Sequence, residues 1–136
     1  MGYCLHKITA IFRSELNSAF KNKNIQSHHY AILSVIDSNG AEINQMKLCE
    51  ELGIDKASMV KIIDHLENLE FIERIGSKAD RRVKNLILTK KGTLFLQEGR
   101  TIRSNIESKL IESLSPAETE QFKKLLLKIL DHQQSI

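Results

Sequence analysis

The spacing of apolar residues changes twice in the second half of the chain, and this limits the fold more than any other feature. Over residues 59–69 apolar side chains recur every three or four positions, which is typical of one face of an α-helix. Residues 70–75 and 85–89 instead alternate with a period of about two, which predicts the two strands of a hairpin. The helical spacing returns at Phe95. The chain therefore has to place a short hairpin between amphipathic helices.

Capping residues mark two helices directly before this hairpin. Asn44 can cap a helix that ends at Gly53, where a glycine adopts the left-handed conformation at low cost. Asp55 can cap the next helix, which runs to about Leu69. Two helices joined by a tight glycine turn form a helix-turn-helix candidate whose second helix would read DNA. Together with the hairpin, this order predicts a winged helix.

Further amphipathic helices flank the winged helix. Residues 5–20 carry apolar side chains at helical spacing, Ser27 can cap a short helix, and the turn-forming residues 37–40 end it. On the other side, Thr89 can cap a helix that continues to about Leu114.

The last helix begins with a capping box. Ser115 stands at the N-cap, Pro116 at the first helical position and Glu118 three residues after the cap. We expect this helix to bury its apolar stripe, which comprises Phe122, Leu125, Leu126, Ile129 and Leu130.

A winged helix does not need these flanking helices, so we expect them to pair with a second copy of the chain across a two-fold axis. The predicted fold is mainly α with a small β-hairpin wing. Residues 25–92 would form the winged helix-turn-helix DNA-binding region, and residues 1–24 and 93–136 the helical dimerisation region.

Positive charge is concentrated around the hairpin. Residues 76–92 carry six lysines and arginines against a single acid, Asp80, whereas the formal net charge of the whole chain is only +3. A local basic loop on a nearly neutral body indicates an anionic partner, because such a loop attracts phosphates and releases counterions. The alternative is a solvated charged loop on a winged helix that binds another protein.

Composition and motifs argue against other classes of protein. The apolar runs are far shorter than the roughly 20 residues of a membrane span, and no secretory segment begins the chain. We therefore expect a cytoplasmic protein. Cys4 and Cys49 have no metal-type neighbours, and the adjacent His28 and His29 do not form a ligand pair, so no metal or other cofactor is expected. Without a phosphate-binding glycine loop or a nucleophile with a base, an enzyme is not expected either.

The wing resembles that of the MarR-type bacterial transcription regulators. The matching positions are Asp80, Arg82, Leu86, Leu88, Thr89 and Gly92. Residues 43–74 are similar to the helix-turn-helix of this family, and the flanking helices are similar to its dimer helices. The resemblance implies a homodimer that binds a pseudo-palindromic operator in double-stranded DNA, usually as a repressor, and leaves it when a small molecule or an oxidant arrives. It places such a protein in the bacterial cytoplasm, on the nucleoid when DNA-bound.

The resemblance also implies which residues contact DNA. On the reading helix these are Lys56, Ala57, Ser58, Val60, Lys61 and His65, and in the wing Lys78, Asp80, Arg81, Arg82 and Lys84. Arg82 would enter a minor groove, and we expect Asp80 to hold its guanidinium through a charge-assisted pair. For Lys61 and His65 the alternative is an exposed helix face. Because Ala57 and Val60 replace donors common in the family, base readout would depend partly on methyl contacts and DNA shape.

An effector pocket in this family lies between the dimer helices and the DNA-binding lobe. The residues that would line it here are His6, Phe12, His29 and Tyr30, although core packing explains Phe12 and Tyr30 equally well. Some relatives sense oxidants with a cysteine in the first helix, so Cys4 is a candidate redox residue, while Cys49 is expected to be a small buried thiol. The alternative function is a winged-helix protein-interaction or dimerisation module without operator-specific DNA binding.

Overall fold

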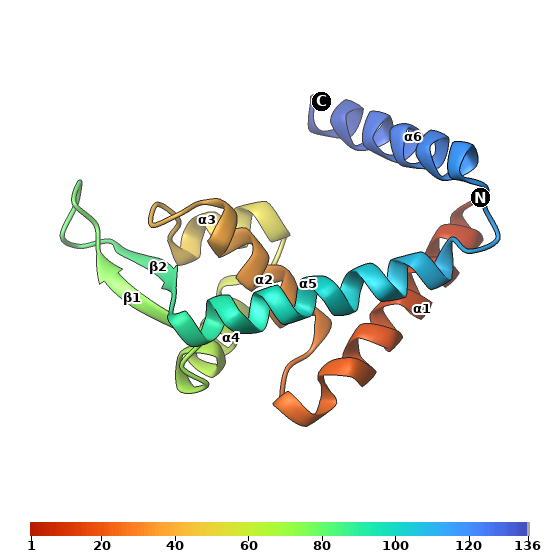
Figure 1. Cartoon of the computed structure of the whole chain (residues 1–136). Coiled ribbons are helices and arrows are strands. Elements are labelled where there is room, and N and C mark those ends of the chain that lie inside the picture. The colour runs from red at the N-terminus through yellow and green to blue at the C-terminus, as the bar shows by residue number, and fades with distance from the viewer. Residues whose placement is uncertain (136) are drawn as a thin grey trace.

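The computed structural model of the protein describes residues 1–135 and shows a winged helix at one end of a long helical framework (Figure 1). Helix α5 runs from the hairpin to the opposite end, where the start of α1 and helix α6 lie (Figure 1). The elements in chain order are α1 (Gly2–Phe20), η1 (Lys21–Lys23), α2 (Ser27–Ser38), α3 (Gln45–Leu52), α4 (Lys56–Asn68), β1 (Ile72–Gly76), β2 (Lys84–Leu88), α5 (Lys90–Leu110) and α6 (Pro116–Gln134). The predicted fold class is confirmed.

The helix-turn-helix forms where its capping residues predict it. The side chain of Asn44 accepts a hydrogen bond from the Lys47 amide, and that of Asp55 accepts one from the Ser58 amide, both over 2.9 Å. Gly53 ends α3 with a φ of 63°, a conformation that residues with a Cβ rarely adopt. These local interactions fix the start of α3, its end and the start of the reading helix α4.

The two strands pair antiparallel, with Ile72 opposite Leu88 and Gly76 opposite Lys84. They lie within two residues of the predicted strands. The hairpin is also fastened to the segment before α3, because the Leu86 amide donates to the Ile43 carbonyl over 2.8 Å and an isolated bridge joins Asn44 to Asn85. The wing and the start of α3 are therefore held as one unit by backbone hydrogen bonds.

A single apolar core joins the winged helix to the framework. Its fully buried side chains come from α1, α2, α3, α4, both strands and α5, and include Phe20, Leu33, Leu48, Met59, Ile63, Leu66, Ile72, Leu86 and Leu96. The ring of Phe95 lies 5.3 Å from that of Phe20 and 4.9 Å from that of Phe71, measured between centroids. Aromatic packing thus connects the end of α1, the start of β1 and α5.

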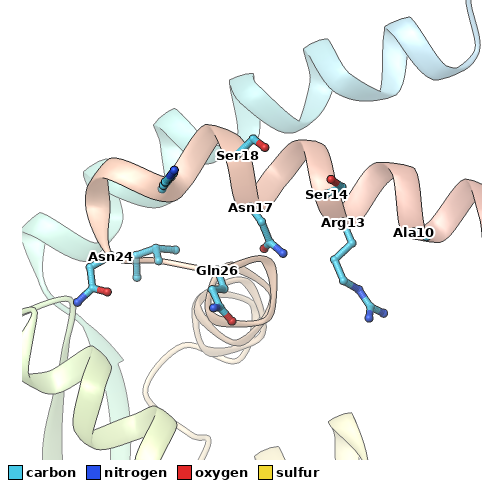
Figure 2. Close-up of a pocket in the computed structure, with 9 residues that line it drawn as sticks. Ala10, Arg13, Ser14, Asn17, Ser18, Asn24 and Gln26 are labelled. Carbon is cyan, nitrogen blue, oxygen red and sulfur yellow. The ribbon is translucent and has the colours of Figure 1, made fainter.

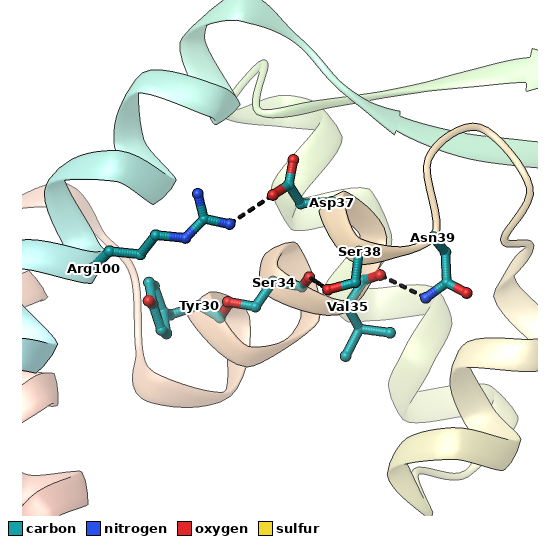
Figure 3. A network of polar contacts seen from close by, with 7 residues as sticks. All are labelled: Tyr30, Ser34, Val35, Asp37, Ser38, Asn39 and Arg100. Carbon is teal, nitrogen blue, oxygen red and sulfur yellow. Dashed lines mark hydrogen bonds and ion pairs between the residues drawn. The ribbon is translucent and has the colours of Figure 1, made fainter.

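One ion pair adds to this connection between the framework and the winged helix, and a second joins two parts of the framework. Arg100 of α5 contacts Asp37 of α2 over 2.6 Å, as Figure 3 shows beside the hydrogen bonds of α2. Lys23 of η1 contacts Glu98 of α5, also over 2.6 Å. Since all four side chains are substantially exposed, each pair contributes at most about 1 kcal/mol.

Several predicted boundaries need correction. Gln26, not Ser27, is the N-cap of α2, because its amide donates to Nδ1 of His29 over 2.9 Å. Helix α5 ends at Leu110 rather than near Leu114. The capping box of α6 is confirmed, with Ser115 and Glu118 bonded reciprocally.

The expectation that α6 buries its apolar stripe is wrong for the single chain. No residue of α6 is buried, and only Leu126 of the stripe is half-buried. The exposed members are Phe122, Leu125, Ile129 and Leu130, and Leu127 is exposed as well. The reason is geometric: α6 turns back at the far end of α5, lies apart from the other elements and covers none of the core (Figure 1).

We predict that Gly92→Ala destabilises the fold by about 1–3 kcal/mol or more, because an added Cβ would overlap the backbone carbonyl of Phe71. Chemical denaturation at a fixed protein concentration measures the change. Gly76→Ala is the matched control, since a Cβ there meets nothing within 4 Å. Equal stability of the two variants would contradict the close approach of α5 to β1.

Candidate nucleic-acid interface

The reading helix α4 has one buried and one exposed face. Met59, Ile63 and Leu66 are fully buried and fix the orientation of the helix about its own axis. The opposite face is exposed and includes the predicted contacts Lys56, Ala57, Ser58, Val60 and Lys61. Two lysines, one hydroxyl and two small apolar side chains can meet phosphates, base edges and thymine methyl groups, which are the groups that a major groove presents.

The wing tip is a compact turn that displays basic side chains. The Ser77 amide donates to the Val83 carbonyl and the Val83 amide to the Asp80 carbonyl, each over 3.0 Å. The predicted wing residues are all exposed, and they are Lys78, Asp80, Arg81, Arg82 and Lys84. The turn therefore presents four cations and one carboxylate to solvent.

The expected ion pair between Asp80 and Arg82 is wrong. Oδ1 of Asp80 instead accepts a hydrogen bond from the backbone amide of Arg82 over 2.9 Å. Within residues 1–135 no ion pair joins the two side chains. The carboxylate shapes the turn from within, as aspartate does when it bonds the backbone two residues on, and leaves the Arg82 guanidinium available to a ligand.

The basic side of the wing adjoins the start of α3. A shallow hollow of about 360 Å³ is lined there by Asn44, Gln45, Met46, Arg74, Arg82, Val83, Lys84 and Leu86. The exposed α4 face, the wing and the beginning of α3 thus belong to the same lobe of the protein (Figure 1).

Arg74 is a residue at this interface that the sequence analysis missed. Its guanidinium on β1 lies 2.7 Å from Asp64 and 3.5 Å from Glu67, both on α4. Asp64 and Glu67 are three residues apart and therefore lie on the same face of a helix. This spacing, followed by an arginine in the next strand, is the sequence pattern that could have predicted the contact. The contact joins the reading helix to the wing strand.

His65 does not share the environment of the other predicted α4 contacts. It is half-buried, and its Nε2 atom lies 2.8 Å from the carbonyl oxygen of Asn24, in the turn before α2. Its ring centroid is 4.8 Å from that of the buried His29. The ring is thus engaged with the segment between α1 and α2.

The predicted effector residues separate into two groups. Phe12 and Tyr30 line a cavity of about 760 Å³ formed by α1, α2 and α5, whereas His6 and His29 are not among its lining residues. Cys4 is exposed near the start of α1, and Cys49 is half-buried against the core rather than fully buried; both are free thiols. Oxidant sensing by Cys4 stays a prediction.

Within residues 1–135, every helix is too short or too polar to span a membrane. In the same residues, no group of three or more histidine, cysteine or acidic side chains has a geometry that could hold a metal ion.

An exposed reading helix, fixed by a buried face and flanked by a basic hairpin, defines a winged helix-turn-helix DNA-binding fold. Residues 23–83 match a family model described as MarR family.

Solved structures share nearly the whole fold. The MepR–DNA complex of S. aureus is similar at 22% identity and a TM-score of 0.81, covering 97% of each chain. CouR, a transcriptional repressor bound to a 23-mer DNA duplex, is similar at 24% identity and a TM-score of 0.83, covering 96% of this chain and 92% of that one. A mutant MarR from E. coli complexed with operator DNA is similar at 22% identity and a TM-score of 0.80, with coverage of 95% and 92%. The chain is thus similar in sequence to the MarR family over residues 23–83, and it shares the fold of these solved structures over nearly its whole length.

We predict that Asp80→Ala weakens DNA binding by about 0.5–1.5 kcal/mol although it removes a negative charge, because the Arg82 amide loses its acceptor and the turn loosens. Asp80→Asn keeps an acceptor at the same position and should bind as tightly as the native protein or more tightly. Fluorescence anisotropy with a labelled duplex measures both. If the two variants gained affinity equally, charge alone would explain the role of Asp80.

Proposed function

We propose that this protein is a homodimeric repressor that binds a pseudo-palindromic operator and is released from it by a small molecule. Residues 25–92 would read DNA, and residues 1–24 and 93–136 would form the dimer. One observation carries this proposal. The reading face of α4 is exposed, and the helices α1 and α6, at the other end of the molecule, have exposed apolar side chains (Figure 1). The protein would act in the cytoplasm, on nucleoid DNA.

The exposed apolar surface of α1 and α6 supports a dimer. On α1 the large exposed apolar side chains are Tyr3, Leu5, Ile8 and Ile11, and on α6 they are Phe122, Leu125, Leu127, Ile129 and Leu130. Such surface on two helices is unfavourable in water and is buried readily against an identical copy.

Symmetry would then set the mode of DNA recognition. Two copies of α4 related by a two-fold axis would enter successive major grooves about 34 Å apart, and the wings would reach the flanking minor grooves. Lys78, Arg81, Arg82 and Lys84 would neutralise phosphates, with Arg82 reaching furthest into the groove. Repression would follow because the bound dimer occupies promoter DNA.

The cavity between α1, α2 and α5 supports release by a small molecule. Tyr30 lines it and is only 4% exposed, and within residues 1–135 its hydroxyl has no hydrogen-bond partner. A buried hydroxyl without a partner is unfavourable, so a ligand that bonds it would be stabilised. Arg13 and Arg103 also line the cavity, which favours an anionic ligand.

A second hollow adjoins this cavity. It measures about 580 Å³, runs along the polar side of α1 and shares Arg13, Asn17 and Gln26 with the cavity. Figure 2 shows Asn17 and Arg13 pointing from α1 toward the side on which Gln26 lies. A ligand in the cavity could thus contact the turn that leads from α1 into the winged helix.

We predict that Arg82→Ala weakens binding to DNA from upstream of the protein's own gene by about 1–3 kcal/mol and lowers the salt dependence. Arg81→Ala, which removes the same charge from the neighbouring residue, should cost less if Arg82 enters the groove. Anisotropy titrations across salt, with excess nonspecific competitor, measure both variants. Equal losses would contradict the groove role of Arg82, and no binding at low salt would favour the protein-interaction module instead.

We predict that Ile129→Lys shifts the protein toward a monomer at micromolar concentration, because it places a charge within the proposed apolar interface. Gln121→Lys adds the same charge to the same helix at an exposed polar position and should leave the dimer intact. Sedimentation equilibrium measures the mass of each. A native protein that is monomeric at this concentration would overturn the dimer.

A further inference from the structure

Three imidazole rings lie together between the framework and the reading helix, and we call His28, His29 and His65 the imidazole cluster. The centroid of His29 is 4.0 Å from that of His28 and 4.8 Å from that of His65. His28 lines the cavity, His29 is buried, and His65 belongs to α4. The cluster therefore forms a continuous contact from the cavity wall to the helix that reads DNA.

The hydrogen bonds of the cluster require a neutral His29. Its Nδ1 accepts the Gln26 amide at the start of α2 over 2.9 Å, so the single proton of the ring has to reside on Nε2. His65 has the opposite role, because the Asn24 carbonyl can only accept and Nε2 of His65 therefore donates. A second proton on His29 would occupy Nδ1, so the Gln26 amide at the start of α2 would lose its acceptor. Gln26 lies two residues after Asn24, whose carbonyl accepts from His65.

The surroundings of the cluster oppose such a proton. Burial first, and then the fields of His28 and His65, lower the pKa of His29 from its usual value of 6.5 to about 4. The pKa of His28 is also lowered, by burial first and then by His65 and Arg13. Arg13 comes from α1, His28 and His29 from α2 and His65 from α4, while the turn contributes the uncharged Asn24 carbonyl and Gln26 amide. Arg13 is cationic, so a proton on His28 or His29 would add a second positive charge to this group.

We propose that His29 and His65 are positioning residues that hold α4 in its DNA-binding place while the imidazole cluster is neutral, so that acid weakens DNA binding. When His29 is protonated, its ring moves out of the buried site and its hydrogen bond with the Gln26 amide is lost. The turn around Asn24 then shifts, and the hydrogen bond from His65 to the Asn24 carbonyl is lost as well. Asn24 has a φ of 57°, a left-handed conformation that asparagine adopts more readily than most residues with a Cβ, and this turn presents its carbonyl to His65. The inference rests on the proposed function, since it concerns DNA binding.

The direction of the effect follows from proton linkage. A histidine whose pKa is lowered in the DNA-binding state binds fewer protons there than in the released state, so affinity is constant above about pH 6.5 and falls as the pH drops toward about 4. Between about pH 7.5 and 5.5, each such group lowers affinity by up to roughly tenfold, and the two groups of a dimer by up to about a hundredfold. General protonation of surface groups acts in the opposite sense, because added positive charge strengthens phosphate binding.

The same linkage connects the cluster to the cavity. An anion bound beside Arg13 and His28 would favour the protonated form of His28, and the charge would lie 4.0 Å from His29. Because a charge on His28 disfavours a proton on His29, such an anion would oppose the effect of acid on α4.

The experiment compares DNA affinity at about pH 7.5 and 5.5, at constant ionic strength, for the full-length protein and three variants. His29→Gln retains an acceptor where a capping box uses glutamine, without a titrating ring. His65→Gln retains a donor for Asn24 without the ring contact. His132→Gln removes a histidine outside the cluster. The probes are a duplex from upstream of the protein's own gene and an unrelated duplex.

We expect the native protein and His132→Gln to lose affinity in acid by up to roughly tenfold per protomer, and His29→Gln to lose little or none. His65→Gln keeps the titrating His29 and a donor for Asn24, so it should lose as much as the native protein. A native affinity that stays constant or rises in acid, or an equal loss in His29→Gln, would overturn the inference. Should His29→Gln fail to fold, as circular dichroism would show, the protection of α4 in the native protein decides.

Hydrogen exchange of the DNA-free protein separates this inference from the proposed function. Protection of α4 relative to α5 should fall in acid in the native protein and in His132→Gln, but not in His29→Gln. If the native protein bound neither duplex at neutral pH, the proposed function would fail, and the exchange of α4 would still test the positioning role. Unchanged protection of α4 in acid would contradict that role directly.

Discussion

Burial of one face of α4 is the interaction on which the rest of the structure depends. Met59, Ile63 and Leu66 are completely inaccessible to solvent, and truncating one such side chain typically costs 2–5 kcal/mol, against a total stability of roughly 5–15 kcal/mol. These three residues can therefore occupy only one position against the core. Burial of this face also determines that Lys56 and Lys61 point to solvent, because the residues on the two faces of a helix keep a fixed angle to one another. The reading face is oriented by residues that never contact DNA.

The wing obeys a different constraint. Its cations repel one another and supply no cohesion, so the hairpin has to be held at its base. Backbone bonds from Leu86 to Ile43, the ladder between β1 and β2, and the contacts of Arg74 with two acids of α4 provide this support. The tip needs only the local bond from the Arg82 amide to Asp80. Positive charge can thus concentrate where it meets DNA, at a distance from the interactions that fold the hairpin.

The sequence predicted the features that depend on neighbours in the chain. Asn44, Asp55, Thr89 and Ser115 cap helices as expected, because the donor of each cap lies three residues away. Predictions failed where a side chain had a choice of partners.

Asp80 had both a guanidinium and an amide within reach, and it bonds the amide. The partner of His65 lies 41 residues away, beyond the reach of any local pattern. The stripe of α6 was correctly identified as apolar, but amphipathicity shows that a face will be buried without showing which molecule buries it.

The composition of the reading face has a consequence for regulation in the proposed regulator. Ala57 and Val60 offer no hydrogen bonds, so much of the affinity has to come from phosphates, and specificity has to come from the spacing of the two reading helices as well as from base contacts. An effector then needs only to change the spacing of the two reading helices. A coupling free energy of 1–3 kcal/mol between effector binding and DNA binding corresponds to roughly a 5–150-fold change in DNA affinity. The exposed ion pair Arg100–Asp37 contributes at most about 1 kcal/mol. A polar contact of this strength between α5 and the DNA-binding lobe is comparable to the free energy that a bound ligand or a proton can supply. The position of the lobe is therefore adjustable without unfolding its core.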